Sequence, residues 1–460
     1  MLSNLAARDV ETVIHPYTNL DTLRGVGPLV IERGQGIWLY DSDGKAYIDS
    51  MAGLWCTALG YGNEELIEAA TAQMRKLSFG HLFAFKSHDP AIELAEKLKE
   101  IAPLPVSKVF FCASGSEAND TQIKLVRYMN NALGRPKKKK FIARQKAYHG
   151  VTLASASLSG LPHNHLDFDL PLEGFLHTTC PHHYRLAEAG ESEEDFATRL
   201  AADLEQMIER EGPETIAAFI AEPLMGAGGV IVPPKTYFEK IAKVCARHDI
   251  YMISDEVICG FGRLGTPFGM QALGFKANAM SLAKALSSAY LPIAAVTVPE
   301  QMYTTLVDQS RKLGTFGHGF TYGGHPVAAA VALKTLEIYA RDRVFEQVAA
   351  KAPRFQARLR KLGEHPLVGE ARGVGLVGGV ELVADKKSKR AFDPKRTVAL
   401  RAVNFAQEEG VISRAIAGDT VSICPPLLIT ESEIDEMFDR LSRGLDRAHD
   451  WARSEGLIAR

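Results

Sequence analysis

An apolar run that ends in two acids constrains the fold of this chain more than any other feature. Residues 250–254 read Ile-Tyr-Met-Ile-Ser and lead directly into Asp255 and Glu256. Such a short run with polar flanks predicts a buried parallel strand whose carboxyl end presents Asp255. A second apolar segment, around Met280, ends just before Lys284, 29 residues after Asp255. Since ligands of open α/β sheets bind beyond the carboxyl ends of the strands, we expect both side chains at one site.

A lysine and an aspartate presented together in this way suit pyridoxal phosphate. The lysine would form a Schiff base with this cofactor, and the aspartate would keep its pyridine nitrogen protonated. The pair therefore indicates a cofactor-dependent enzyme. A protein that binds the cofactor without catalysis is the alternative, and the intact lysine and aspartate count against it.

The composition bounds the remaining possibilities. A chain of 460 residues exceeds one compact core, so two lobes are expected. A net charge of −2 argues against nucleic-acid binding. The six cysteines are scattered without a C-x-x-C pair, which favours reduced thiols in a cytoplasmic protein. No segment approaches the ~20 apolar residues that span a bilayer, so no membrane contact is expected.

The order of elements predicts an α/β protein with a mostly parallel sheet. Residues 1–36 are interpreted as an irregular arm, and a hairpin is expected around Asp43-Gly44. Helices are expected over 64–76 and from an N-cap at Asp89. Further strands and helices alternate up to about residue 298, as in a doubly wound sheet.

The segment 161–194 is polar and rich in histidine, and we interpret it as irregular. Its histidines lack the spacing of metal ligands, so no metal site is predicted. From residue 327 onward helices and short strands predict a smaller α+β lobe. The expected division is 1–58 for the arm and hairpin that join this lobe, 59–326 for the large cofactor-binding domain, and 327–460 for the small domain.

A turn of serine and glycine precedes one predicted helix. Ser114, Gly115 and Ser116 follow the predicted strand 108–112 and open a helix that runs toward Asn130. Free backbone N–H groups and the helix dipole make such a turn an anion site, although an ordinary capped helix has the same sequence signature.

Taken in order, these motifs resemble those of class III aminotransferases, also called ω-transaminases. The resemblance is carried by Ser114 to Asp120, Tyr148 to Gly150, Ile220 to Pro223, Ser254 to Val257, Gly260 to Arg263, and Ala283-Lys284. It covers nearly the whole chain. The closest likeness is to the amine:pyruvate and polyamine:pyruvate branch, on Gly53 to Trp55, His318 to Thr321, and Cys424 to Pro426.

The resemblance implies the fold type I of pyridoxal phosphate enzymes and a homodimer with shared active sites. It implies Lys284 and Asp255 as catalytic residues. The implied cofactor-binding residues are Gly115, Ser116, Tyr148, His149, Glu222, Asp255, Val257, Lys284 and, from the second subunit, Thr321. Tyr148 and Val257 would enclose the ring, and Glu222 would help to orient Asp255. The resemblance implies Arg414 as the residue that binds the keto acid's carboxylate. Tyr17, Trp55, Phe83 and Phe85 are expected as apolar walls of the substrate pocket, with core packing as the alternative for each of them.

The implied reaction moves an amino group from a primary amine to a keto acid such as pyruvate, with ping-pong kinetics. The amine donor stays open between ω-amines, diamines and aryl-alkyl amines. A fixed arginine would leave an unpaired charge beside an apolar substrate, so we expect Arg414 to move. A mutase or lyase on the same scaffold is the alternative. The chain departs from the family at Ala285, Ser287 and Ala289, and Ala289 is expected to narrow the pocket floor.

Overall fold

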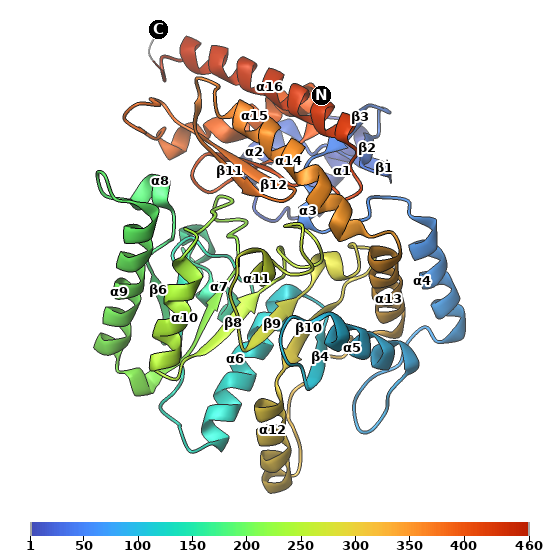
Figure 1. Ribbon diagram of the computed structural model, residues 1–460. Helices are drawn as coiled ribbons and strands as arrows, with labels where there is room; N and C mark the ends of the chain where they lie inside the picture. The colour runs from blue at the N-terminus through green and yellow to red at the C-terminus, as the bar shows by residue number, and fades with distance from the viewer. Residues whose placement is uncertain (1, 459–460) are drawn as a thin grey trace.

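A seven-stranded sheet forms the centre of the computed structural model, which describes residues 2–458 (Figure 1). The strand order is β4-β10-β9-β8-β7-β5-β6. The strands are β4 (Lys108–Cys112), β5 (Lys140–Arg144), β6 (Phe175–Thr178), β7 (Ile216–Ala221), β8 (Tyr251–Asp255), β9 (Ala279–Leu282) and β10 (Ala294–Val298). Strands β5 to β9 are parallel, and β10 is antiparallel to both of its neighbours. The mostly parallel sheet is confirmed.

Helices cover both faces of this sheet. They are α4 (Glu64–Lys76), α5 (Asp89–Ile101), α6 (Gly115–Ala132), α7 (Leu153–Leu158), α8 (His183–Leu186), α9 (Glu193–Glu211), α10 (Tyr237–Arg247), α11 (Gly269–Ala272), α12 (Glu300–Leu313) and α13 (Pro326–Arg341). Met252 packs into the core on one face of β8, with α10 and α13, while Ile253 packs with α6 on the other. Burial on both faces explains why β8 is a continuous apolar run.

The two ends of the chain meet in a second lobe. Its elements are β1 (Ile31–Gln35), β2 (Trp38–Asp41), β3 (Ala46–Asp49), α14 (Val344–Leu362), β11 (Val368–Val374), β12 (Val377–Leu382), α15 (Val398–Glu408), β13 (Val411–Ile412), β14 (Arg414–Ile416), β15 (Thr420–Ile423) and α16 (Glu431–Ser454). The predicted β2–β3 hairpin extends this lobe, because β3 pairs in parallel with β13. In Figure 1 the blue hairpin therefore lies beside the orange and red C-terminal elements. The numerical domain limits stay a prediction.

The N-terminal arm is more regular than predicted. It contains α1 (Asn4–Thr12) and α2 (Leu20–Val26) before β1. Ser3 and Asn19 cap these helices by accepting hydrogen bonds from backbone N–H groups. Each helix buries only one residue, so the apolar periodicity that reveals helices in a sequence is weak here.

Three further expectations were wrong in detail. The segment 161–194 contains β6, an edge strand that was interpreted as irregular, and α12 was not predicted. The first cap of α5 is His88, whose Nδ1 accepts from the N–H of Ala91, so Asp89 is already the first helical residue. The remaining short elements are α3 (Ala52–Trp55) and the 3₁₀ turns η1 (Pro162–Asn164), η2 (Pro213–Thr215), η3 (Lys284–Leu286) and η4 (Pro394–Arg396).

Across residues 2–458, every helix is either too short or too polar to cross a lipid bilayer.

Candidate active site

Two neighbouring strands bring Asp255 and Lys284 to one cavity. Asp255 ends β8 and is paired with Ser281 of β9, and Lys284 follows β9 directly after Ala283. Both residues line a cavity of about 830 Å³ at this edge of the sheet. The arrangement is the one that parallel α/β sheets offer to ligands.

Most residues assigned to the site from the sequence line this cavity. They are Tyr17, Trp55, Gly115, Ser116, Tyr148, His149, Glu222, Asp255, Val257, Lys284 and Arg414. Phe83, Phe85 and Thr321 do not line it and are exposed. Phe83 instead packs over Gly319, where an added Cβ would lie 2.7 Å from the phenylalanine ring.

The Asp255 carboxylate is held by three hydrogen-bond donors. Its Oδ2 accepts from Asn119 Nδ2 at 2.8 Å and from His149 Nδ1 at 2.7 Å. Its Oδ1 accepts from the N–H of Val257 at 3.1 Å. Asp255 is only 3% exposed, so these donors replace the water that would otherwise stabilise its negative charge.

Glu222, which follows β7, positions the loop after β5. Its Oε1 accepts from the N–H of Tyr148 at 3.1 Å, and its Oε2 accepts from the N–H of Gly226 at 3.0 Å. Burial raises the pKa of the Glu222 carboxyl, while His149 and Arg144 lower it. In the described chain no hydrogen bond joins Glu222 to Asp255, so any help in orienting Asp255 is indirect.

Lys284 lies at the boundary between the strand ends and the apolar wall. Its Nζ is 5.5 Å from the centre of the Trp55 ring. Burial lowers the pKa of the Lys284 amine below that of an exposed lysine, although nearby acidic groups oppose this shift. A lysine with a lowered pKa has more neutral amine available as a base or nucleophile.

The start of α6 forms a cradle for an anion. Ser114 caps the helix through a bond from the N–H of Glu117, and Ser116 Oγ accepts from the N–H of Val151. Gly150 has a φ of +136°, and an added Cβ would lie 2.6 Å from Ser116 Oγ. Glycine is thus required here both by backbone conformation and by the close approach of Ser116.

The opposite wall carries a cation without an acidic partner. The Arg414 guanidinium lies 5.4 Å from the centre of the Trp55 ring and 5.8 Å from that of Tyr17. Tyr17 donates from its hydroxyl to Asn164 Oδ1 at 3.0 Å. Within residues 2–458 Arg414 forms no ion pair, and aromatic faces hold it instead. Trp55 is both core and pocket wall, since it is 2% exposed and lines the cavity.

Two asparagines of the site were missed from the sequence. Asn119 lies one helical turn after Gly115 on α6, and this spacing could have placed it on the same face. Asn164 lies in the irregular segment before β6, where no sequence pattern marks it. Both line the cavity.

The expectation that Ala289 narrows the pocket floor was wrong. Ala289 is exposed and lies outside the cavity lining of its own chain, as do Ala285 and Ser287. Ser287 Oγ donates to the carbonyl of Leu291, and the carbonyl of Ala285 accepts from Tyr339. These residues support the turn after Lys284 from behind.

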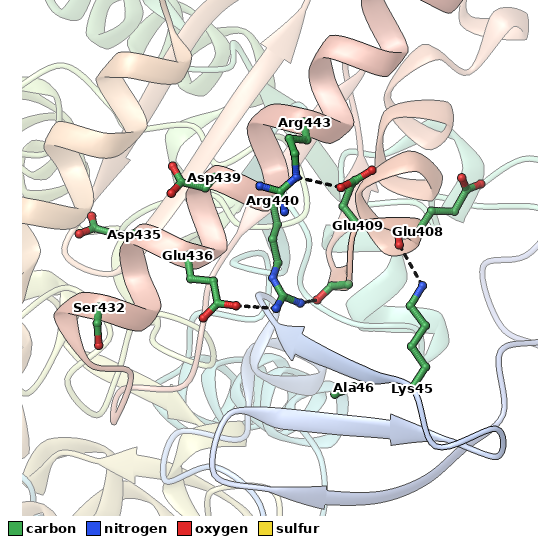
Figure 2. Close-up of a pocket in the computed structure, with 11 residues that line it drawn as sticks. Lys45, Ala46, Glu408, Glu409, Ser432, Asp435, Glu436, Asp439, Arg440 and Arg443 are labelled. Carbon is green, nitrogen blue, oxygen red and sulfur yellow. Dashed lines mark hydrogen bonds and ion pairs between the residues drawn. The ribbon is translucent and has the colours of Figure 1, made fainter.

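Figure 2 shows a second cleft, of about 620 Å³, between the β2–β3 hairpin and helices α15 and α16. Its two arginines are paired with glutamates that also line the cleft. Arg440 pairs with Glu436 and Arg443 with Glu409, while Lys45 donates to backbone carbonyls at the end of α15. None of the predicted site residues lines this cleft. The chemistry therefore belongs to the cavity at the strand ends.

One histidine of segment 161–194 has acidic neighbours. His182, Glu370 and Glu381 bring three possible metal-ligating atoms within 4.8 Å of one another. Arg372 lies 2.6 Å from the Glu370 carboxylate and 2.9 Å from that of Glu381, and Arg185 also binds Glu381. The two arginines already balance these acids, so the cluster is an ion-pair network between the lobes.

Pyridoxal phosphate fits the cavity chemically. Its phosphate matches the N–H groups and hydroxyl at the start of α6, and its pyridinium nitrogen matches Asp255. Two buried polar atoms of cavity residues, Asn119 Oδ1 and His149 Nε2, have no hydrogen-bond partner within the described chain. Buried polar atoms usually have partners, so a polar ligand in the cavity would complete this network.

Comparisons with known proteins agree with this site. The family model of class-III aminotransferases matches residues 22–445. A γ-aminobutyrate transaminase 3 of Solanum lycopersicum, described as chloroplastic, is 51% identical over 449 residues, covering 96% of this chain and 86% of that protein. A mitochondrial γ-aminobutyrate transaminase 1 of Oryza sativa subsp. japonica is 52% identical over 426 residues, covering 92% and 82%.

Solved structures give the same result. The ω-transaminase of Pseudomonas jessenii in complex with PMP is 56% identical, with a TM-score of 0.95, covering 98% of this chain and 99% of that one. A thermostable ω-transaminase variant, engineered for asymmetric synthesis of enantiopure bulky amines, matches with the same identity and TM-score over 97% of this chain and 100% of that one.

These relatives are all transaminases, which favours amino-group transfer over the mutase or lyase alternative. The fold is the type I fold of pyridoxal phosphate enzymes, and the family uses that cofactor. This chain belongs to the class III aminotransferases, which transfer amino groups from amines to keto acids with pyridoxal phosphate.

Proposed function

We propose that this chain transfers an amino group from a primary amine to pyruvate or a similar keto acid, with Lys284 as the proton carrier and Asp255 as the partner of the cofactor's ring nitrogen. The observation that carries the proposal is the convergence of these two side chains on one cavity from adjacent strands. Gly115 and Ser116 would hold the phosphate, and Tyr148 and Val257 would lie against the ring.

Bound pyridoxal phosphate supplies an electron-withdrawing ring that takes up the charge left at the substrate carbon when its proton is removed. Three donors hold the Asp255 carboxylate in the position where it would meet the ring nitrogen. Lys284 would accept the proton from the substrate carbon and deliver it to C4′ of the cofactor. The lowered pKa of Lys284 suits both tasks, since its neutral form becomes available nearer to neutral pH.

Arg414 is proposed to bind the carboxylate of the keto acid. Among residues 2–458, Arg414 has no ion-pair partner, and the only acidic residues that line the cavity, Glu222 and Asp255, lie on the opposite side. The engineered variant named above carries substitutions at a tryptophan, a phenylalanine and an arginine that are spaced along its chain as Trp55, Phe83 and Arg414 are spaced here. Substitution of those three residue types to accept bulky amines supports a role in substrate binding.

The same wall favours an amine donor that carries a carboxylate. The curated relatives described above are named γ-aminobutyrate transaminases. A second ammonium group, as in a diamine, would meet Arg414 without an acid to balance it. We therefore propose ω-amino acids as the preferred donors, with aryl-alkyl amines accepted when Arg414 moves aside.

A homodimer is proposed from an exposed apolar surface beside the cavity. Phe79, Phe83 and Phe85 are all exposed. The ring centre of Phe79 lies 6.1 Å from that of Tyr322, which follows Thr321 in the sequence. A second copy that covered these loops would bury their aromatic rings and bring Thr321 to the neighbouring cavity.

A cytoplasmic location is also proposed, since all six cysteines are unpaired.

The test of this function is a donor screen. The protein with pyridoxal phosphate is incubated with pyruvate and one amine at a time, and alanine is measured. We expect alanine from γ-aminobutyrate and β-alanine at higher kcat/KM than from diamines of similar length. Consumption of the amine without any keto acid would instead support a lyase or mutase. Sedimentation of the purified protein tests the dimer separately.

A further inference from the structure

Asn119 binds two groups of the active site through its side-chain nitrogen. It lies in α6, is 1% exposed and lines the cavity. Its Nδ2 donates to Asp255 Oδ2 at 2.8 Å and to the carbonyl of His149 at 2.7 Å. The side chain therefore joins three separate elements: the helix that carries the anion cradle, the loop after β5 and the end of β8.

The two acceptors fix how the amide is oriented. Nδ2 carries two hydrogens, and each has an oxygen to bind. A rotated amide would place Oδ1 against the Asp255 carboxylate and the His149 carbonyl, where no hydrogen is available. Asn119 is thus a permanent donor to Asp255.

The second donor to the same oxygen, His149 Nδ1, is of a different kind. A histidine donates from Nδ1 only when that nitrogen carries a hydrogen, which depends on the tautomer of the ring. An amide does not titrate. Hydrogen bonds to a carboxylate favour its charged form, and the Asn119 bond does so at every pH at which the protein is folded.

We propose that Asn119 is a positioning residue, which holds the Asp255 carboxylate in place and in its charged form for the cofactor's ring nitrogen. The proposal rests on the assignment of Asp255 above. It deepens that assignment, because it states what keeps a nearly buried carboxylate ionised and correctly aimed.

Two substitutions separate positioning from general support of the fold. Asn119→Ala removes the donor and leaves both acceptors short of one bond. Asn119→Asp keeps the shape but places a second carboxyl against Asp255. Asn130→Ala is the matched control, because Asn130 lies on the same helix, is 2% exposed and donates from Nδ2 to the carbonyl of Val126 at 3.0 Å, outside the cavity.

The first readout is the affinity of the cofactor-free protein for pyridoxal phosphate, measured by equilibrium dialysis. Loss of a hydrogen bond to a charged group predicts a Kd about ten- to a hundredfold higher in Asn119→Ala. Asn130→Ala should bind as the unmodified protein does. An unchanged Kd in Asn119→Ala, in a variant with unchanged circular dichroism, would overturn the proposal.

The second readout is the pH dependence of the same Kd. In Asn119→Asp the two carboxyls repel when both are charged, and a protonated one can donate to the other. The quantity compared is the Kd of Asn119→Ala divided by the Kd of Asn119→Asp. We expect this ratio to be about tenfold higher at about pH 6 than at about pH 8.5. A purely structural role predicts no such recovery, so a constant ratio between the two variants would also count against the proposal.

Asp255→Asn distinguishes failure of this inference from failure of the proposed function. If Asp255→Asn weakens cofactor binding and lowers kcat while the Asn119 variants behave normally, the positioning role alone is wrong. If Asp255→Asn keeps both affinity and kcat, the assignment of Asp255 itself is wrong. Because Asp255→Asn is nearly isosteric, folding should be retained in this comparison.

Discussion

The cavity has two sides that are built differently. The side that we propose for the cofactor consists of Gly115, Asn119, Glu222, Asp255 and Lys284, on strand ends and α6. The side that we propose for the substrates consists of Tyr17, Trp55, Asn164 and Arg414, from the arm, short turns and the small lobe. On the cofactor side the Asp255 and Glu222 carboxylates accept five hydrogen bonds between them. On the substrate side Tyr17–Asn164 is the one side-chain hydrogen bond between these four residues in the described chain.

The substrate side also keeps unused donors. Trp55 Nε1 and Asn164 Nδ2 are buried without a partner in residues 2–458, and Arg414 forms no ion pair. A side that binds one cofactor can fix its charged groups in advance, which favours rate and affinity. A side that must accept an amine and then a keto acid benefits from groups that can change partners. The following predictions test this difference, beginning with the largest effect.

Lys284→Ala should have the largest effect, because it removes the proton carrier of the cofactor side. General base catalysis typically contributes two to four orders of magnitude, so we expect kcat to fall about a hundred- to ten-thousandfold. The measurement is alanine formed from pyruvate, with folding followed by circular dichroism. Lys334→Ala is the control, since Lys334 is paired with Glu337 at the surface. Activity within tenfold of the unmodified enzyme would refute the role of Lys284.

The pH dependence of turnover should reflect the lowered pKa of Lys284. An exposed lysine has a pKa of about 10.4. Burial lowers the pKa of Lys284, so more of its amine is neutral at a given pH below that value. We expect log kcat to be level at alkaline pH and to fall by about one unit per pH unit below the lowered pKa. A rate that keeps rising about tenfold per pH unit up to pH ~10 would show an ordinary lysine and contradict this environment.

Gly150→Ala should damage the anion cradle and hence the cofactor side. The added Cβ would lie 2.6 Å from Ser116 Oγ and 2.4 Å from Ser155 Oγ, and the φ of +136° disfavours any side chain. Such crowding costs about 1–3 kcal/mol, so the Kd for pyridoxal phosphate should rise about ten- to a hundredfold. Gly25→Ala is the control, because an added Cβ there meets nothing within 4 Å. Equal Kd values in both variants would place the phosphate elsewhere.

The cofactor side was also the part that could be predicted from the sequence. Strand β8 could be predicted because both of its faces are buried and its sequence is therefore a continuous apolar run. The end of that run predicted the position of Asp255. Helix α4 has the predicted limits of 64–76, because it has a regular apolar face. The serine–glycine turn marked the start of α6.

On the substrate side, Tyr17, Trp55 and Arg414 were named from the sequence and line the cavity, whereas Asn164 depends on tertiary contacts that leave little trace in the sequence. Asn164 precedes β6, a four-residue edge strand that buries only Phe175 and Thr178, so no apolar pattern revealed that segment. Tyr17 lies between α1 and α2, in an arm that was interpreted as irregular because each helix buries only one residue. Helix α12 was missed for a similar reason, since it buries only Met302 and Thr305.

Arg414→Ala should separate the two substrates, which sharpens the comparison within the substrate side. A hydrogen-bonded charge pair contributes about 1.5–3 kcal/mol, so KM for pyruvate should rise about ten- to a hundredfold. KM for an aryl-alkyl amine should change less than about threefold, because that donor has no carboxylate. Initial rates at varied pyruvate and varied amine give both constants. Equal increases in KM for the two substrates would mean that Arg414 supports the cavity wall but does not bind the carboxylate.

Tyr17→Phe should have the smallest effect, since it removes a single neutral hydrogen bond and keeps the ring that faces Arg414. Such a bond contributes about 0.5–1.5 kcal/mol, so KM for the amine should rise about two- to tenfold while the Kd for pyridoxal phosphate stays unchanged. Tyr17→Leu, which also removes the ring, should raise KM for pyruvate in addition, because Arg414 loses one of its two aromatic neighbours. The double variant Tyr17→Phe with Asn164→Ala measures the coupling between the hydroxyl and the amide. If the effects of the two substitutions on KM are additive, the hydroxyl and the amide are not coupled. If Tyr17→Phe weakens cofactor binding, the two sides of the cavity are not independent.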